Sequence, residues 1–157
     1  MNALFKPELV RIVDAFQSKS DCLNYMACLL SASGCLSFPD RYLAAVKGRE
    51  EIMSTGIGKG VAIPHARDLT VECLRIAVCM ISQALDFNSV DSEPVNLVFM
   101  IAVPQNSNQE YMKILRNLSE YLRTEENRAT LLGANSDWEL YNYVHKIEDS
   151  IIASLAD

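Results

Sequence analysis

The sequence predicts a layered α/β domain in which helices cover both faces of a central sheet. Two apolar runs, residues 74–82 and 95–103, are rich in β-branched side chains and nearly free of polar ones. Such runs are typical of strands that are buried on both faces. Segments with helical spacing of apolar residues precede and follow them, and this order favours a layered fold. We expect one domain over residues 1–157.

The first third of the chain is expected to contain one strand and two helices. Residues 8–14, ELVRIVD, have the composition of a strand. A helix is predicted from about 21 to 33, because Ser18 and Ser20 can each act as its N-cap and Gly34 is a typical residue after a helix end. A second helix is predicted over 39–51, since it would start at a proline.

The second half is expected to be mainly helical once the buried strands are complete. Residues 86–94, DFNSVDSEP, indicate a turn or short hairpin between the two strands. Apolar side chains recur at helical spacing in 108–123. Thr124 can cap a short helix, and Ser136 with Glu139 forms a capping-box pattern before a last helix.

Composition excludes several classes of function. A net charge of −6 without a basic block argues against nucleic acid or an anionic membrane as the partner, and it suits a basic protein better. Five cysteines, an odd number with no CxxC pair, argue against a disulfide framework or a zinc site. The apolar runs are too short to span a bilayer, and the N-terminus lacks a signal-peptide pattern. We therefore expect a cytoplasmic protein with reduced thiols, no metal and no cofactor.

The segment with the clearest chemical pattern is GIGKGVAIPHARD, residues 56–68. Its glycines match neither the GxGxxG pattern of dinucleotide-binding folds nor the GxxxxGK(S/T) pattern of the phosphate-binding loop. Val61–Ile63 is predicted to be a strand that ends at Pro64. If the chain stays extended, His65 and Arg67 lie on one face, about 7 Å apart.

A histidine beside an arginine can carry a phosphoryl group. The neutral imidazole is a nucleophile when its other nitrogen donates a hydrogen bond, and the cation can hold phosphoryl oxygens. Glycine N–H groups and the hydroxyls of Ser54 and Thr55 are further candidate donors. The alternative is a structural or surface histidine, with the glycines in an ordinary tight loop and Arg67 in solvent.

The residues from 48 to 67, GREEIMSTGIGKGVAIPHAR, resemble the signature of enzyme IIA of the bacterial phosphoenolpyruvate-dependent phosphotransferase system, fructose–mannitol type. The resemblance extends over nearly the whole chain. It includes the following segments: SKSDCLNYMACLLSASG, ALDFNSVDSEPVNLVFMIAVP and SDWELYNYV. It implies a three-layer α/β/α sandwich with a mixed central sheet of about five strands flanked by helices.

The resemblance also implies a phosphocarrier that uses no cofactor. His65 matches the phosphorylated histidine, which receives the group from a basic phosphohistidine protein, HPr or its nitrogen-branch relative, and passes it to a cysteine of a IIB component. Arg49 matches an arginine near the phosphoryl group. Thr55 and Arg67 match positions of the same motif and are further candidate phosphoryl-binding residues.

The chain departs from the family pattern at one site position. Many members have a second histidine on the helix after the central strand, where this chain has Tyr111. A tyrosine donates a hydrogen bond but carries no positive charge at neutral pH, so the rate of transfer is in question. The other histidine, His145, is expected on the surface of the last helix.

Three functions fit these observations. The first is a phosphocarrier with a regulatory output, like the nitrogen-regulatory IIA branch, which binds a target protein. The second is the IIA arm of a fructose- or mannitol-type transporter. The third is a binding module that no longer transfers phosphate. The retained Arg49 and PHAR motif favour transfer, and the absence of IIB or IIC segments favours regulation. Neither nucleic acid nor membrane insertion is expected.

Overall fold

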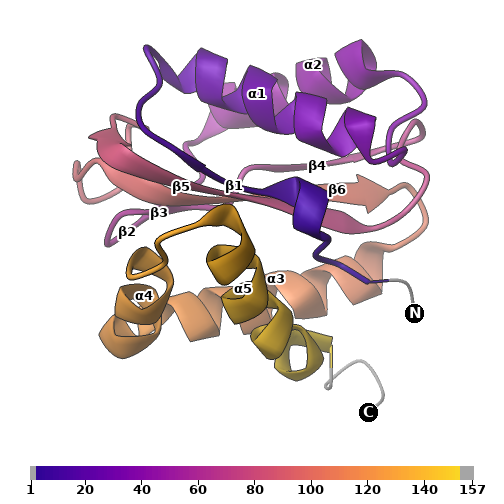
Figure 1. Cartoon of the computed structure of the whole chain (residues 1–157). Coiled ribbons are helices and arrows are strands. Elements are labelled where there is room, and N and C mark those ends of the chain that lie inside the picture. Colours follow the sequence, from indigo (N-terminus) through magenta and orange to yellow (C-terminus); the bar gives the residue numbers. More distant parts are fainter. Residues whose placement is uncertain (1–2, 153–157) are drawn as a thin grey trace.

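The computed structural model describes residues 3–152, which form one mixed sheet of six strands with helices on both sides (Figure 1). The strands are β1 (Val10–Val13), β2 (Gly56–Gly58), β3 (Val61–Ala62), β4 (His65–Asp68), β5 (Arg75–Leu85) and β6 (Val95–Pro104). Their order is β1-β5-β6-β3-β2, and β4 also pairs with β6. The β5–β6 and β2–β3 pairs are antiparallel, and the remaining pairs are parallel.

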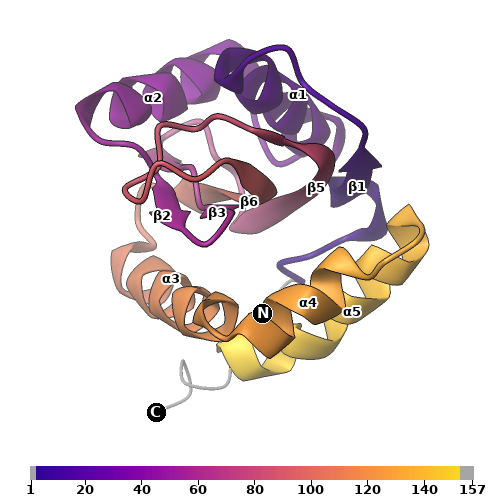
Figure 2. The same ribbon diagram turned by 90° about the vertical axis from the view of Figure 1, so that its left-hand side faces the viewer.

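The helices form two outer layers, as the predicted three-layer sandwich requires. One layer consists of α1 (Lys19–Ala32) and α2 (Pro39–Ile52). The other consists of α3 (Asn108–Arg123), α4 (Glu125–Leu132) and α5 (Asp137–Ile152). The view in Figure 2 shows the two layers on opposite sides of the sheet. No helix within residues 3–152 has the length and apolar content needed to cross a bilayer.

The central strands β5 and β6 supply both cores, because successive side chains point to opposite faces. Ala77 and Cys79 pack in the core under α1 and α2. Ile76 and Val78 pack in the core against α3 and α5. Each fully buried Val, Leu or Ile contributes about 1.5–3 kcal/mol, so a strand buried on both faces is strongly held. The prediction of doubly covered strands is confirmed.

Element ends differ from the expectations in a few places. A 3₁₀ turn, Pro7–Leu9, precedes β1 and shortens the predicted first strand. Helix α1 starts at Lys19, earlier than expected, and Ser18 accepts the Asp21 N–H as its N-cap over 3.1 Å. The predictions for α2 and α3 hold within a residue. The glycine segment, expected to be a loop, contains strand β2.

Candidate functional site

His65 lies at an open edge of the sheet. Strands β3 and β4 both run parallel to β6, and Pro64 joins them while its carbonyl accepts the Ile101 N–H over 2.9 Å. Pro64 therefore ends β3 as predicted, but the chain resumes as a strand directly after it. Within the described residues β2 pairs with β3 and leaves β4 paired to β6 alone. The other edge of β4 therefore has no strand partner among these residues, and His65 and Arg67, two positions apart on it, lie on one face of the sheet.

The imidazole of His65 is held in one tautomer by the backbone. Its Nδ1 lies 2.8 Å from the carbonyl oxygen of Ile63. Because a carbonyl oxygen only accepts hydrogen bonds, Nδ1 carries the proton and donates it, and Nε2 keeps its lone pair. The ring is half-buried, and burial lowers its pKa below the ordinary histidine value. The neutral form therefore predominates at pH 7, with Nε2 as the nucleophilic atom.

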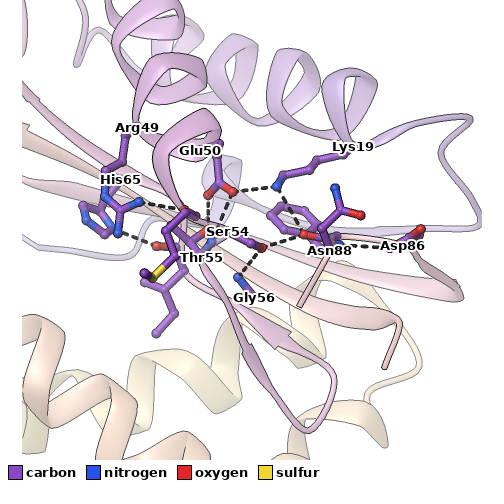
Figure 3. Close-up of polar contacts among 12 residues, drawn as sticks. Lys19, Arg49, Glu50, Ser54, Thr55, Gly56, His65, Asp86 and Asn88 are labelled. Atoms are coloured by element: carbon purple, nitrogen blue, oxygen red, sulfur yellow. Dashed lines mark hydrogen bonds and ion pairs between the residues drawn. The ribbon is translucent and has the colours of Figure 1, made fainter. Parts of the chain in front are cut away.

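Arg49 and Tyr111 lie beside this ring, and Arg67 acts on Tyr111. Figure 3 shows Arg49 beside His65, and the Arg49 guanidinium donates to the Met53 carbonyl over 2.7 Å. Arg49 also contributes to the lowered pKa of His65. The rings of His65 and Tyr111 lie 5.5 Å apart between centroids and are tilted by 44°.

Tyr111 stays protonated although two cations act on it. Burial raises the pKa of Tyr111, while the charges of Arg49 and Arg67 partly counteract that rise. Its hydroxyl is therefore a donor at neutral pH. The structure thus brings four of the five predicted site residues, His65, Arg49, Arg67 and Tyr111, into one cluster.

Thr55 is close to this cluster but directs its hydroxyl into the protein. Its N–H donates to a Glu50 carboxylate oxygen over 3.1 Å, and its hydroxyl donates to the other oxygen of that carboxylate. Its carbonyl accepts the Ile63 N–H over 3.0 Å. The Ser54 hydroxyl donates to the Phe87 carbonyl over 2.6 Å. Thr55 therefore supports the segment before His65.

The glycines build a hairpin, not the expected cradle of N–H groups around the imidazole. Gly58 and Gly60 have φ of 100° and 80°, and with Lys59 at 58° they form the β2–β3 turn. Four residues lie between Gly60 and His65, so an extended chain spans roughly 16 Å over these five steps. Of the two interpretations of the glycines, the ordinary tight loop therefore describes this turn better than a set of N–H donors to a phosphoryl group.

Sequence reasoning missed two residues, Lys19 and Glu50. Lys19 Nζ lies 2.7 Å from a carboxylate oxygen of Glu50, and Figure 3 shows it on the side of Glu50 away from His65. One signal was present in the sequence. A lysine in the first turn of a helix opposes the helix dipole, so it needs a partner elsewhere. His145, in contrast, lies on the surface as expected and stacks on Tyr141.

Comparison with known families fits this geometry. Residues 3–147 match the model of the phosphoenolpyruvate-dependent sugar phosphotransferase system, EIIA 2. The chain belongs to this family. Its members are phosphotransferases that act through a phosphohistidine, so the chain is an enzyme IIA domain with a phosphoryl-transfer role.

Relatives come from both sugar transport and regulation. The chain is 35% identical over 83% of its length to the fructose-specific EIIABC component of Bacillus subtilis, of which it spans about a fifth (20%). It is 32% identical over 82% of its length to the fructose-specific EIIA component of Haloferax volcanii, covering 84% of that protein.

Solved structures show the same fold. IIA-Ntr, the nitrogen regulatory protein of Neisseria meningitidis, superimposes with a TM-score of 0.82 at 27% identity, over 90% of this chain and 96% of that one. IIA mannitol of Escherichia coli was solved in complex with phosphorylated IIB mannitol. It superimposes with a TM-score of 0.76 at 19% identity, over 90% of this chain and 97% of that one. IIA domains of this system thus interact with IIB domains and phosphocarrier proteins.

Proposed function

We propose that His65 accepts a phosphoryl group on Nε2 from an HPr-type phosphohistidine protein, and that the domain acts in nitrogen-related regulation in the cytoplasm. The hydrogen bond between Nδ1 and the Ile63 carbonyl, 2.8 Å long, carries this proposal because it leaves Nε2 as the free lone pair. The regulatory output is supported by the similarity to IIA-Ntr. Five free cysteines within the described residues suit a reducing compartment.

The phosphoryl transfer needs no cofactor, because the bond that forms replaces the bond that breaks. Nε2 attacks phosphorus and forms a new N–P bond, while the N–P bond of the donor breaks and its electron pair returns to the donor imidazole. The Nδ1 proton stays in its bond to Ile63 throughout. Positioning and cationic donors provide most of the stabilisation in such transfers.

We assign the surrounding residues to the phosphoryl oxygens. Arg49 and Arg67 offset the roughly two negative charges that the phosphoryl group brings. Tyr111 donates a neutral hydrogen bond from the position that matches the second histidine of the family. Thr55, whose hydroxyl is bonded to Glu50, acts by holding the loop beside this site.

The partner docks next to Arg49 in our proposal. Ile52 and Met53, at the end of α2, are 82% and 63% exposed, although both are large apolar side chains. Met53 also holds Arg49 through its carbonyl. An apolar surface beside the reacting group suits a protein that exchanges phosphate with other proteins.

A labelling experiment tests the proposal. The purified chain is incubated with phosphoenolpyruvate, enzyme I and an HPr-type donor, and the stability of the incorporated phosphate is measured. We expect acid-labile, base-stable label on the wild type and none on His65→Ala. A wild type that takes no label from several HPr types would favour the alternative of a binding module without transfer.

The IIA arm of a sugar transporter is the second candidate. It is favoured by the 35% and 32% identity to fructose-specific proteins. In that case the Nε2–P bond breaks and an S–P bond forms on a IIB cysteine. Adding a purified fructose-type IIB domain to the labelled chain distinguishes the two functions. Rapid loss of label to IIB supports transport, whereas retention of label together with capture of a regulated protein supports regulation.

A further inference from the structure

An ion pair between a buried carboxylate and a half-buried lysine lies behind the segment that carries His65. Glu50, at the end of α2, is only 8% exposed, and Lys19 of α1 contacts its carboxylate at 2.7 Å. Lys19 is itself held in place, because it donates to the Phe87 carbonyl over 3.2 Å and sits 4.6 Å from the centre of the Phe87 ring. Neither charge contacts the imidazole of His65 directly.

Hydrogen bonds, linked through the backbone of Thr55 and of Ile63, connect this pair to the imidazole. The Glu50 carboxylate accepts both the N–H and the hydroxyl of Thr55. The Thr55 carbonyl accepts the Ile63 N–H over 3.0 Å. The Ile63 carbonyl accepts Nδ1–H of His65 over 2.8 Å. The Ile63 N–H and carbonyl belong to successive peptide groups, so Glu50, through Thr55, holds the backbone on one side of residue 63 while the carbonyl on its other side meets His65.

The charge of Glu50 adds a second requirement. His65 is faced by Arg49 and Glu50 from α2, by Arg67 on its own strand and by Tyr111 from α3. Glu50 favours the charged imidazolium, opposing Arg49. An unpaired carboxylate would also repel an incoming phosphoryl group.

Lys19 reduces the repulsion between Glu50 and a phosphoryl group, because its charge neutralises the Glu50 carboxylate. Lys47 and Glu51 line the same open groove, of about 410 Å³, as Lys19 and Glu50. Of the two lysines that line this groove, Lys19 is the one in contact with the Glu50 carboxylate.

We propose that Lys19 and Glu50 are positioning residues for phosphoryl transfer: through Thr55 and Ile63 they fix the His65 tautomer, and Lys19 shields the phosphoryl group from the Glu50 charge. This inference rests on the proposed function, since it concerns the same histidine. A merely structural ion pair would stabilise α1 against α2 and leave the state of the imidazole unchanged.

Nitrogen NMR of the imidazole separates the two roles. In protein labelled with ¹⁵N-histidine, the ring shifts report the tautomer and the pKa of unphosphorylated His65. The variants are Lys19→Met, Glu50→Gln, the double variant and Lys19→Arg. Glu148→Gln is the matched control, because Glu148 is 7% exposed and likewise accepts two donors, the N–H groups of Leu4 and Phe5.

We expect the two single variants to shift the pKa of His65 in opposite directions. Lys19→Met raises the pKa of His65, Glu50→Gln lowers it, and the double variant stays near the wild type. The rate of labelling from the HPr-type donor falls about tenfold in Lys19→Met and recovers in Lys19→Arg. Glu148→Gln lowers thermal stability without moving the pKa or tautomer of His65.

Equal His65 pKa and tautomer in all variants would overturn the inference, even if the stabilities fall. If Lys19→Met does not fold, Glu50→Gln decides alone: a lowered pKa supports the inference and an unchanged one overturns it. A wild type that takes no label would instead refute the proposed function. In that case the NMR readings on the unphosphorylated protein still test the positioning.

Discussion

In the proposed function, the chemistry at the level of single residues depends on the pair of His65 and Tyr111. Their rings lie 5.5 Å apart, and the burial that raises the pKa of Tyr111 keeps its hydroxyl protonated. A neutral donor contributes about 0.5–1.5 kcal/mol, whereas a charged donor contributes about twice as much. A tyrosine in place of a histidine therefore favours a functional but slower carrier.

We expect Tyr111→Phe to slow labelling of His65 by up to about tenfold, because one neutral hydrogen bond to the phosphoryl group is lost. Tyr111→His should speed labelling, since an imidazolium can donate a charged hydrogen bond. The measurement is the initial rate of phosphate transfer from the HPr-type donor, with thermal unfolding as the control for folding. An unchanged or slower Tyr111→His would argue that Tyr111 does not occupy the second-histidine position.

The β2–β3 hairpin and the loop over 86–94 form one packed unit at the scale of elements. A Cβ at Gly56 would come within 2.2 Å of the Ser89 hydroxyl and 3.0 Å of the Ser89 Cα. The Gly56 carbonyl also accepts the Val90 N–H over 3.2 Å. Gly56 is thus required by close approach of the loop, and the hairpin follows directly on Thr55, which supports His65.

Gly56→Ala should destabilise the fold by about 1–3 kcal/mol, because the added methyl group overpacks against Ser89. Gly48→Ala is the matched control. Gly48 lies within α2, and a Cβ there meets nothing within 4 Å, so we expect a gain of about 0.5–1 kcal/mol. Urea unfolding of both variants measures the difference. Equal free energies of unfolding for the two variants would show that the loop over 86–94 can move to accommodate a methyl group at Gly56.

Charge governs the encounter with partners at the scale of the whole molecule. The chain carries a net charge of −6, while the proposed site presents Arg49 and Arg67 beside exposed apolar side chains. An acidic body attracts a basic donor over long range, and salt screens that attraction. The local arginines then act on the phosphoryl group alone.

Added salt is therefore expected to slow the second-order transfer from a basic phosphocarrier. Raising ionic strength from about 0.05 M to about 0.5 M should lower the rate constant several-fold, because the Debye length shrinks from near 14 Å to about 4 Å. Rapid-quench measurements across this range test it, with unfolding curves at each salt concentration as the control. A rate that is constant or rises with salt would show that apolar contacts dominate docking.

Helices and buried strands were predictable because their signals are local. The 108–123 helix and the 95–103 strand follow from periodicity and composition, and the structure places α3 and β6 there. The β2 strand was missed, since three glycine-rich residues carry no strand propensity and are held by pairing with β3. His65, Arg49 and Arg67 were identifiable through the motif, whereas the partner of Lys19 was not, because Glu50 lies 31 positions along the chain.

The sequence by itself determined the layered fold, the buried strands and the histidine just after a strand end, because residue spacing fixes which side chains share a face. Only the tertiary structure decided which imidazole nitrogen is free. That choice depends on the Ile63 carbonyl, which faces Nδ1 of His65, while the Ile63 N–H is bonded to Thr55 and Thr55 to Glu50. Backbone direction at such a point results from packing between distant segments, and no local pattern of residues encodes it.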